Sequence, residues 1–240
     1  MRILSLFDYT GAMVRPWADA GHETLCVDTQ HGAFFERRSD GIATAARDLT
    51  DKAVHSELAE WRPDIIFSFP PCTDLAVSGA KHFAAKRERD PLFQHKATAL
   101  AKTAQRIANL CFEQRGDVVP WFAENPVSVL SSTWRKPDYI FDPCDFGGWI
   151  GDDSAAHPLW PDVIPDRDAY TKRTCLWVGN GLILPTPRPV DPVTAGAGTT
   201  PLHAKLGGKS QQTKNIRSAT PRGFAQAMYA ANAALQEAAA

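Results

Sequence analysis

The chain has 240 residues, of which 44% are hydrophobic and 22% are charged, and its formal net charge is −1. Its mean hydropathy of −0.28 is typical of a globular protein and excludes a disordered chain. No apolar run reaches the roughly 18 residues that a membrane-spanning helix needs. The length fits one large domain. Residues 181–240 hold six basic and two acidic side chains, a net charge of +4, so the first 180 residues carry −5. This imbalance predicts a polyanionic partner at the C-terminal end.

The five cysteines are scattered without a C-x-x-C pair, which argues against a disulfide framework and against a structural zinc site. The histidines show no metal-ligand spacing, so no metal site is predicted. The first residues, Met-Arg-Ile-Leu-Ser-Leu-Phe, meet a turn at once and lack the apolar length of a signal peptide. We therefore expect a protein of the reducing cytoplasm, with no membrane attachment.

Apolar runs alternate with helical patterns along the first two-thirds of the chain. Strands are predicted at 3–7, 24–27, 65–69, 118–123 and 174–178, and helices at 13–20, 91–113 and 221–237. This alternation predicts an α/β fold with a Rossmann-like, doubly wound and mostly parallel sheet in a single domain. In such sheets, ligands bind beyond the carboxyl ends of the strands.

The composition changes near residue 181. We expect a catalytic core at 1–180, a Pro- and Gly-rich basic loop region at 181–216, and a C-terminal helix at 217–240 that packs back on the core.

Two turns near the N-terminus are candidate ligand sites. The first strand is followed by Asp8-Tyr9-Thr10-Gly11, a turn that leads into a helix whose amide groups favour an anion. A purely conformational role of the glycine is the simpler reading of this turn. Asp28, after the second strand, stands where nucleotide-binding folds place a ribose acceptor, and an ordinary helix cap is equally compatible with it.

Two further strand ends carry reactive side chains. Cys72 follows Pro70-Pro71 directly after a buried strand, so it leaves the core at the mouth of the sheet. A nucleophilic thiolate there would need a cation or a helix terminus to lower its pKa. Glu124 follows the strand at 118–123, and burial would make it an acid with a raised pKa. The alternatives are a buried structural cysteine and a structural glutamate paired with an arginine such as Arg173.

The order of these residues resembles the cytosine-C5 DNA methyltransferase family. Phe7 to Gly11 is similar to its first motif, Pro71-Cys72 to its nucleophile loop, and Glu124-Asn125 to its Glu-Asn motif. Lys172-Arg173 resembles the end of its Gln-x-Arg-x-Arg motif, and 217–222 its closing motifs. The resemblance extends over nearly the whole chain, and short members of this kind are often encoded by bacteriophages.

This resemblance implies transfer of a methyl group from S-adenosylmethionine to C5 of cytosine in DNA, through a covalent adduct of the cysteine with C6. It implies relaxed sequence specificity, because only about 40 residues separate the arginine motif from the closing motifs. The implied catalytic residues are Cys72, Glu124, Arg173 and Asn125. The implied cofactor site consists of Phe7, Asp8, Tyr9, Thr10, Gly11, Asp28, Asp48 and Pro70. The implied DNA contacts are Ser78, Lys172, Lys205, Lys209, Lys214, Arg217 and Arg222.

Alternatives stay open at this point. Tyr9 replaces a glycine of the family's first motif, so methylenetetrahydrofolate, which would give hydroxymethylcytosine, is an alternative one-carbon donor. A non-catalytic DNA-binding homologue is a further alternative. RNA in place of DNA is a third, because no motif distinguishes the two sugars.

Overall fold

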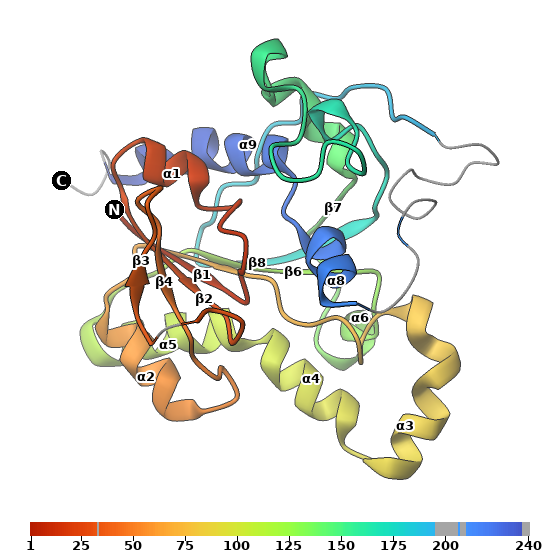
Figure 1. Ribbon diagram of the computed structural model, residues 1–240. Coiled ribbons are helices and arrows are strands. Elements are labelled where there is room, and N and C mark those ends of the chain that lie inside the picture. The colour runs from red at the N-terminus through yellow and green to blue at the C-terminus, as the bar shows by residue number, and fades with distance from the viewer. Residues whose placement is uncertain (33, 195–205, 207–209, 237–240) are drawn as a thin grey trace.

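The computed structural model describes residues 1–32, 34–194, 206 and 210–236. Its centre is one sheet of eight strands in the order β3-β4-β2-β1-β5-β6-β8-β7 (Figure 1). The strands are β1 (Arg2–Leu6), β2 (Glu23–Val27), β3 (Glu36–Arg37), β4 (Ala43–Ala45), β5 (Ile65–Ser68), β6 (Trp121–Pro126), β7 (Tyr139–Phe141) and β8 (Thr174–Gly179).

The five central strands β4, β2, β1, β5 and β6 run parallel to one another. The short β3 pairs antiparallel with β4 at one edge. At the other edge β8 runs antiparallel to both β6 and β7. The strand order turns outward in both directions from β1, as in doubly wound folds. The predicted class, an α/β fold with a Rossmann-like, mostly parallel sheet, is therefore confirmed.

Helices cover both faces of the sheet (Figure 1). On one face lie α2 (Lys52–Glu60), α4 (Phe93–Ala101) and α5 (Thr103–Arg115), and on the other α1 (Arg15–Asp19) and α9 (Arg222–Asn232). The helix α3 (Phe83–Arg89) follows the 3₁₀ helix η1 (Val77–His82), and α6 (Leu130–Thr133) and α8 (Gln211–Ser218) lie near the β6 end of the sheet. The 3₁₀ helices η2 (Pro143–Trp149), η3 (Asp152–Ser154) and η4 (Asp166–Asp168) precede β8, and η5 (Ala233–Gln236) follows α9.

Alternate residues of each central strand pack into different apolar layers. Along β5, Ile66 faces the layer under α2 and α5, whereas Ile65 and Phe67 face the layer under α1 and α9. All three side chains are fully buried. Because successive side chains of a strand point to opposite faces, a continuous apolar run is what a strand covered on both faces requires.

The structure moves several predicted boundaries. The predicted helix at 91–113 is two helices, α4 and α5, and α5 ends at Gly116, which takes the left-handed φ of 76° that glycine tolerates. Glu124 and Asn125 lie inside β6 and not beyond its end. The sequence pattern did not predict the strands β3, β4 and β7 or the helices α2, α3, α6 and α8, the last of which crosses the expected boundary at 216/217.

The reversed direction of β8 has a consequence for the site. Because β8 is antiparallel to β6, residues that precede β8 lie at the edge of the sheet where β6 ends. Lys172 and Arg173 are thereby brought to the same edge as the loop that follows β5. Within the described ranges, no helix combines the length and the apolar character that crossing a bilayer would require.

Candidate functional site

The Cys72 loop is held in place by main-chain hydrogen bonds. The N–H groups of Leu75 and Ala76 both donate to the Cys72 carbonyl, at 3.0 and 2.8 Å. The side-chain amide of the fully buried Asn125 donates to the Pro70 carbonyl at 3.0 Å, which ties β6 to the start of this loop. Of the five cysteines of the chain, Cys72 alone is exposed. The loop therefore presents its thiol at a fixed place on the sheet edge.

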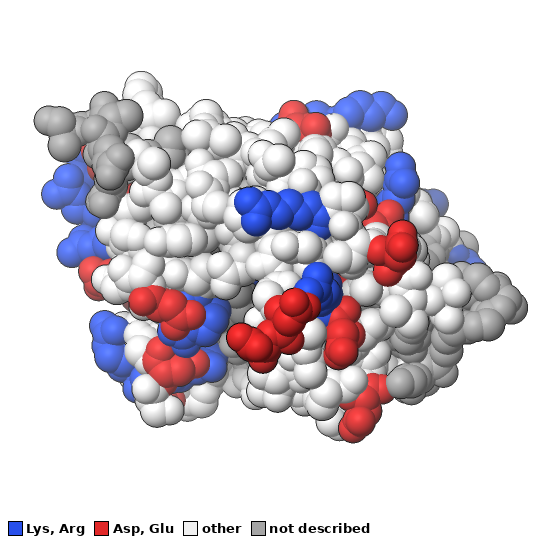
Figure 2. Space-filling model, turned by 90° about the horizontal axis from the view of Figure 1, so that it is seen from above, with Lys and Arg blue, Asp and Glu red and all other residues white. Residues whose placement is uncertain are grey.

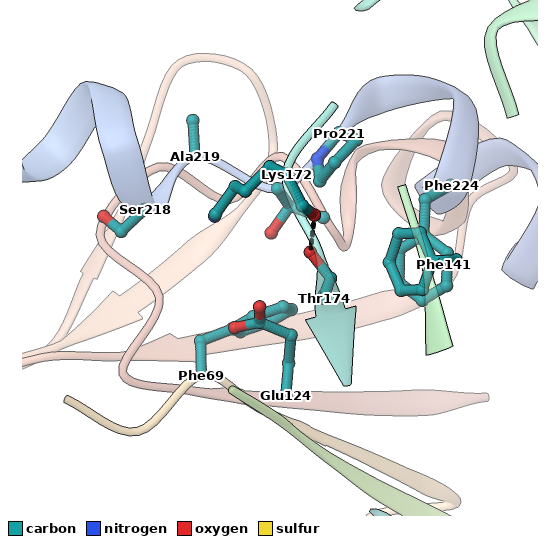
Figure 3. A pocket seen from close by; sticks show the side chains of 10 residues that line it. Phe69, Glu124, Phe141, Lys172, Thr174, Ser218, Ala219, Pro221 and Phe224 are labelled. Atoms are coloured by element: carbon teal, nitrogen blue, oxygen red, sulfur yellow. Dashed lines mark hydrogen bonds between the residues drawn. The ribbon is translucent and has the colours of Figure 1, made fainter. Parts of the chain in front are cut away.

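A pocket lies beside this loop, above the end of β6 (Figure 3). Glu124 rises from β6 into it, and the side chain of Lys172 lies opposite (Figure 3). Three aromatic rings line the pocket, those of Phe69, Phe141 and Phe224. The junction between α8 and α9 completes it with Ser218, Ala219, Thr220 and Pro221.

The carboxyl group of Glu124 is unusual in its surroundings. Its Oε1 atom is buried and has no hydrogen-bond partner in the described chain. Burial raises the pKa of this carboxyl, and the charge of Lys172 opposes that effect. An unsatisfied buried polar atom costs about 1–3 kcal/mol, a cost that a polar atom of a ligand can offset. Burial therefore favours the protonated form of this carboxyl more than an exposed glutamate would allow, and that form can donate a hydrogen bond into the pocket.

The electrostatics connect Cys72 to the same group. Packing around the sulfur raises the pKa of the Cys72 thiol, the Glu124 charge raises it further, and Lys172 lowers it. A carboxylate that raises the pKa of a thiol disfavours the state in which both groups are ionised. Lys172 is the cation that acts on both groups, and its ammonium donates to the Arg217 carbonyl at 2.8 Å.

Lys172 and Arg173 have different surroundings in the structure, a difference that the sequence did not show. Lys172 and Thr174 line the pocket, and the Arg173 between them is exposed. The charge of Arg173 acts instead on Asp142 and Cys175, where it lowers the pKa of each. The cation whose charge acts on the candidate nucleophile is thus Lys172, which was predicted as a DNA contact, and not Arg173.

The turn after β1 is occupied by its own contacts. The Asp8 carboxylate accepts hydrogen bonds from Ser5 Oγ and from the Gly11 N–H, both at 2.8 Å. Tyr9 is exposed and stacks on His31. Phe7 contacts the apolar layer under α2 and α5, and Thr10 Oγ1 donates to Asp8 at 3.2 Å.

The two other predicted acidic ligands also serve their own loops. Asp28 Oδ1 accepts from the Gln30 N–H at 2.8 Å. Asp48 Oδ1 accepts from the N–H and the hydroxyl of Thr50 at 2.9 and 2.7 Å. These contacts match the local capping role that the sequence left open for Asp28. Neither Asp28 nor Asp48 is among the residues that line the pocket above Glu124.

The predicted DNA contacts fall into three groups. Ser78, Lys214 and Arg217 are exposed. Arg222 is not available for a phosphate, because its guanidinium is bonded inside the protein, and this corrects the prediction for Arg222. Lys205 and Lys209 lie outside the described residues. On the described surface seen in Figure 2, basic and acidic side chains stand next to each other and form no single basic patch.

No metal-ion site was predicted, and the described part of the chain holds no group of three or more His, Cys, Asp or Glu side chains that could bind one.

Comparison with known proteins gives distant structural neighbours only. No family model matches the chain, and no curated protein matches it. A nucleoside-diphosphate-sugar epimerase from Agrobacterium tumefaciens matches 50% of this chain with a TM-score of 0.35. A UDP-glucose 4-epimerase from Thermotoga maritima, solved with UDP-glucose, matches 48% with a TM-score of 0.29. A UDP-glucose 4-epimerase from Thermus thermophilus, solved with NAD, matches 47% with a TM-score of 0.30. Each is 17% identical to this chain, and the matches span 35%, 33% and 34% of the neighbours' own lengths.

These neighbours contradict the predicted function. They are nucleotide-sugar epimerases and not DNA methyltransferases. Methylation or hydroxymethylation of DNA cytosine, the donors S-adenosylmethionine and methylenetetrahydrofolate, and the non-catalytic DNA-binding alternative are therefore withdrawn. At this similarity the neighbours carry neither epimerase activity nor an NAD site over to this chain, and the fold assignment rests on its own strand order.

Proposed function

We propose that this protein is an enzyme that works by covalent catalysis with Cys72 as the nucleophile and Glu124 as the acid. The proposal is carried by one observation, the buried and unpartnered Oε1 of a Glu124 carboxyl whose charge acts on the exposed Cys72 thiol. A buried acid next to a nucleophile, with one oxygen left free, suits a ligand that brings its own hydrogen-bond acceptor.

The chemistry that fits is addition to a conjugated carbon. The Cys72 sulfur forms a bond to the electrophilic carbon, and the π electrons move to a nitrogen or oxygen of the substrate. Glu124 gives its proton to that atom, and the thiol proton leaves to solvent on the exposed side of the loop. While the adduct stands, the carbon adjacent to the C–S bond exchanges its hydrogen for a solvent proton, and elimination by the reverse path then breaks the C–S bond, returns a proton to Glu124, releases the exchanged product and restores the thiol.

The pocket lining suits a flat substrate, and the cavity of about 10 Å³, the size of one water molecule, must widen to admit one. Phe69, Phe141 and Phe224 supply ring faces and edges, and the rings of Phe141 and Phe224 stack with centroids 4.5 Å apart. Aromatic walls favour planar, conjugated ligands over branched ones. Lys172 adds a positive charge, which suits a substrate whose heteroatom gains electron density during the addition.

Two predictions continue as proposals of their own. The resemblance to the cytosine-C5 DNA methyltransferase family rests on the order of motifs in the sequence and concerns common ancestry, not the reaction. DNA as a partner is supported by the exposed Lys214 and Arg217, which lie on α8 next to the pocket. The salt dependence of binding to duplex and single-stranded DNA tests this second proposal.

Two small reagents separate the roles of Cys72 and Glu124. Iodoacetamide reports only the thiolate, whereas acrylamide also needs a donor at its carbonyl oxygen as the sulfur adds. Intact-mass spectrometry should show a single acrylamide adduct on the wild type and none on Cys72→Ser. The Cys144→Ser variant is the matched control, because Cys144 is buried and its adduct should be unchanged from wild type.

The decisive variant is Glu124→Gln. The ratio of the acrylamide rate to the iodoacetamide rate should fall about tenfold or more, because general-acid assistance is lost. The iodoacetamide rate itself should rise, since the Glu124 charge no longer raises the pKa of the thiol. An unchanged ratio, or an adduct at another cysteine, would refute the proposal.

A further inference from the structure

The guanidinium of Arg222 is fully used inside the protein. Its Nε and one Nη2 hydrogen donate to Asp168 Oδ1 at 3.2 and 3.0 Å. Its remaining donors reach the carbonyls of Ser154, Ala156 and Ala155 at 2.8, 2.9 and 2.8 Å. Five N–H groups therefore have five bonds, the full capacity of an arginine side chain.

Asp168 is the buried partner in this arrangement. Its residue is 1% exposed, and its Oδ2 also accepts from the main-chain N–H of Arg222 at 2.5 Å, at the first residue of α9. Asp168 and the preceding Arg167 both take left-handed backbone angles, with φ of 50° and 56°. Such angles cost roughly 1–3 kcal/mol each for residues other than glycine and persist only where the surroundings fix them.

The ion pair is connected to the candidate pocket from two sides. Arg222 directly follows Pro221, and Pro221 and Ala219 line the pocket at the α8–α9 junction above Glu124 (Figure 3). On the other side, Asp168 is two residues from Tyr170, which is 1% exposed and whose pKa is raised by burial and by the charges of Asp168 and Glu124. The pair thus joins the segment that carries Tyr170 to the α8–α9 junction, which lines the pocket with Glu124.

We propose that Asp168 and Arg222 are positioning residues of the site, whose ion pair holds the α8–α9 junction over Glu124 and keeps water away from its carboxyl. The proposal rests on the function proposed above. An ion pair on the surface would contribute little to stability. Asp168, however, is buried, and its partner Arg222 directly follows Pro221 in the pocket wall. The titratable or charged groups that act on Glu124, or on which it acts, are Lys172, Cys72, Tyr170 and Cys175.

The test is the pH profile of the acrylamide-to-iodoacetamide ratio in the full chain with Arg222→Lys. Lysine keeps the charge but cannot make the five bonds, so the junction should loosen and water should reach Glu124. The fall of the ratio that accompanies loss of the Glu124 proton should then move to lower pH. At the midpoint of the wild-type fall, the ratio should be about twofold lower than in wild type, which corresponds to about half a pKa unit.

A matched control lies at the opposite end of the same helix. Asn232 is buried and its side chain bonds the main chain of Ile183 in both directions. Asn232→Ala should destabilise the protein without moving the pH profile. Thermal unfolding of all variants separates stability from positioning, and Asp168→Asn is a milder second variant that preserves the size of the side chain.

The outcomes are separable. A profile of wild-type shape in a folded Arg222→Lys or Asp168→Asn protein would overturn the proposal, and so would failure of both variants to fold, because the pair would then serve the fold alone. If Glu124→Gln leaves the ratio unchanged, the proposed function fails instead. A shifted profile in the two variants and not in Asn232→Ala supports the positioning role.

Discussion

Two carboxyl groups of the same sheet, one after β1 and one inside β6, differ in what surrounds them. Asp8, after β1, is 4% exposed and accepts from Ser5 Oγ, from Thr10 Oγ1 and from the Gly11 N–H. Glu124, at the end of β6, has one oxygen with no partner at all in the described chain. Burial raises the pKa of both groups.

The comparison shows that burial alone does not define a site. The turn after β1 supplies its own donors to Asp8, so the carboxyl stabilises the turn and leaves little for a ligand. No turn does this for Glu124, because it lies within β6 and the segment opposite it belongs to β8 and to the α8–α9 junction. A buried acid with unfilled hydrogen-bond capacity is the better functional candidate.

The largest expected effect tests whether the Asp8 carboxyl stabilises the turn after β1. Asp8→Ala should lower the free energy of unfolding by about 4 kcal/mol, because three donors lose their acceptor in the core. Urea denaturation measures this effect. Asp48→Ala is the control, since Asp48 makes similar bonds to Thr50 on an exposed turn and should cost about 1 kcal/mol or less. Equal losses in the two variants would break the distinction.

A histidine offers a second case of a buried group satisfied by its own chain. His157 is 5% exposed, and its Nδ1 accepts from the N–H groups of Leu159 and Trp160 at 3.2 and 3.1 Å. Burial lowers its pKa to about 4.

The unfolded chain binds a proton at His157 more readily than the folded chain does. The free energy of unfolding should therefore hold its full value above pH 6.5 and decline by up to about 3 kcal/mol as the pH falls toward 4. His157→Asn keeps an acceptor but does not titrate, so its stability should depend less on pH in this window. Above pH 7 the variant and the wild type should show parallel profiles. Urea denaturation at a series of pH values checks this, and identical slopes between pH 4 and 6.5 would contradict it.

If Glu124 serves function and not the fold, its replacement should stabilise the protein. Glu124→Gln should raise the free energy of unfolding at neutral pH by about 1 kcal/mol, the scale of stability given up at functional sites. If folding raises the pKa of a carboxyl, the free energy of unfolding falls as the pH increases above the ordinary pKa of that group. The gain should therefore grow with pH and vanish in acid, where both proteins carry no charge at this position. Destabilisation by Glu124→Gln at pH 8 would show that Glu124 is structural.

The smallest expected effect distinguishes the two neighbouring cations. Lys172→Met should slow the alkylation of Cys72 by iodoacetamide at pH 8 by about threefold, because Lys172 lowers the pKa of the thiol. Arg173→Met should leave this rate unchanged, since Arg173 acts on Asp142 and Cys175. A larger effect of Arg173→Met would return that residue to the site.

Much of the fold could be predicted from local pattern. The apolar runs at 3–7, 24–27 and 65–69 coincide with β1, β2 and β5 to within a residue or two, because a strand buried on both faces needs continuous apolar side chains. The short strands β3, β4 and β7 have two or three residues each and leave too little periodicity to detect.

The candidate site was predictable in part. Cys72 stands out because it follows two prolines at a strand end, and Glu124 because it ends an apolar run. The role of Lys172 was not predictable, because alternation along an extended chain separates 172 and 174 from 173 without showing which side faces the pocket. The direction of β8 decides that, and direction depends on pairing with β6.

By itself, the sequence determined which residues are reactive and which runs are buried, because these follow from side-chain chemistry and local period. Only the tertiary structure decided which charges meet. It placed Arg222 against Asp168, filled the capacity of Asp8, and left one oxygen of Glu124 free. Hydrogen-bond satisfaction is a property of the packed chain, since it depends on donors that are distant in sequence.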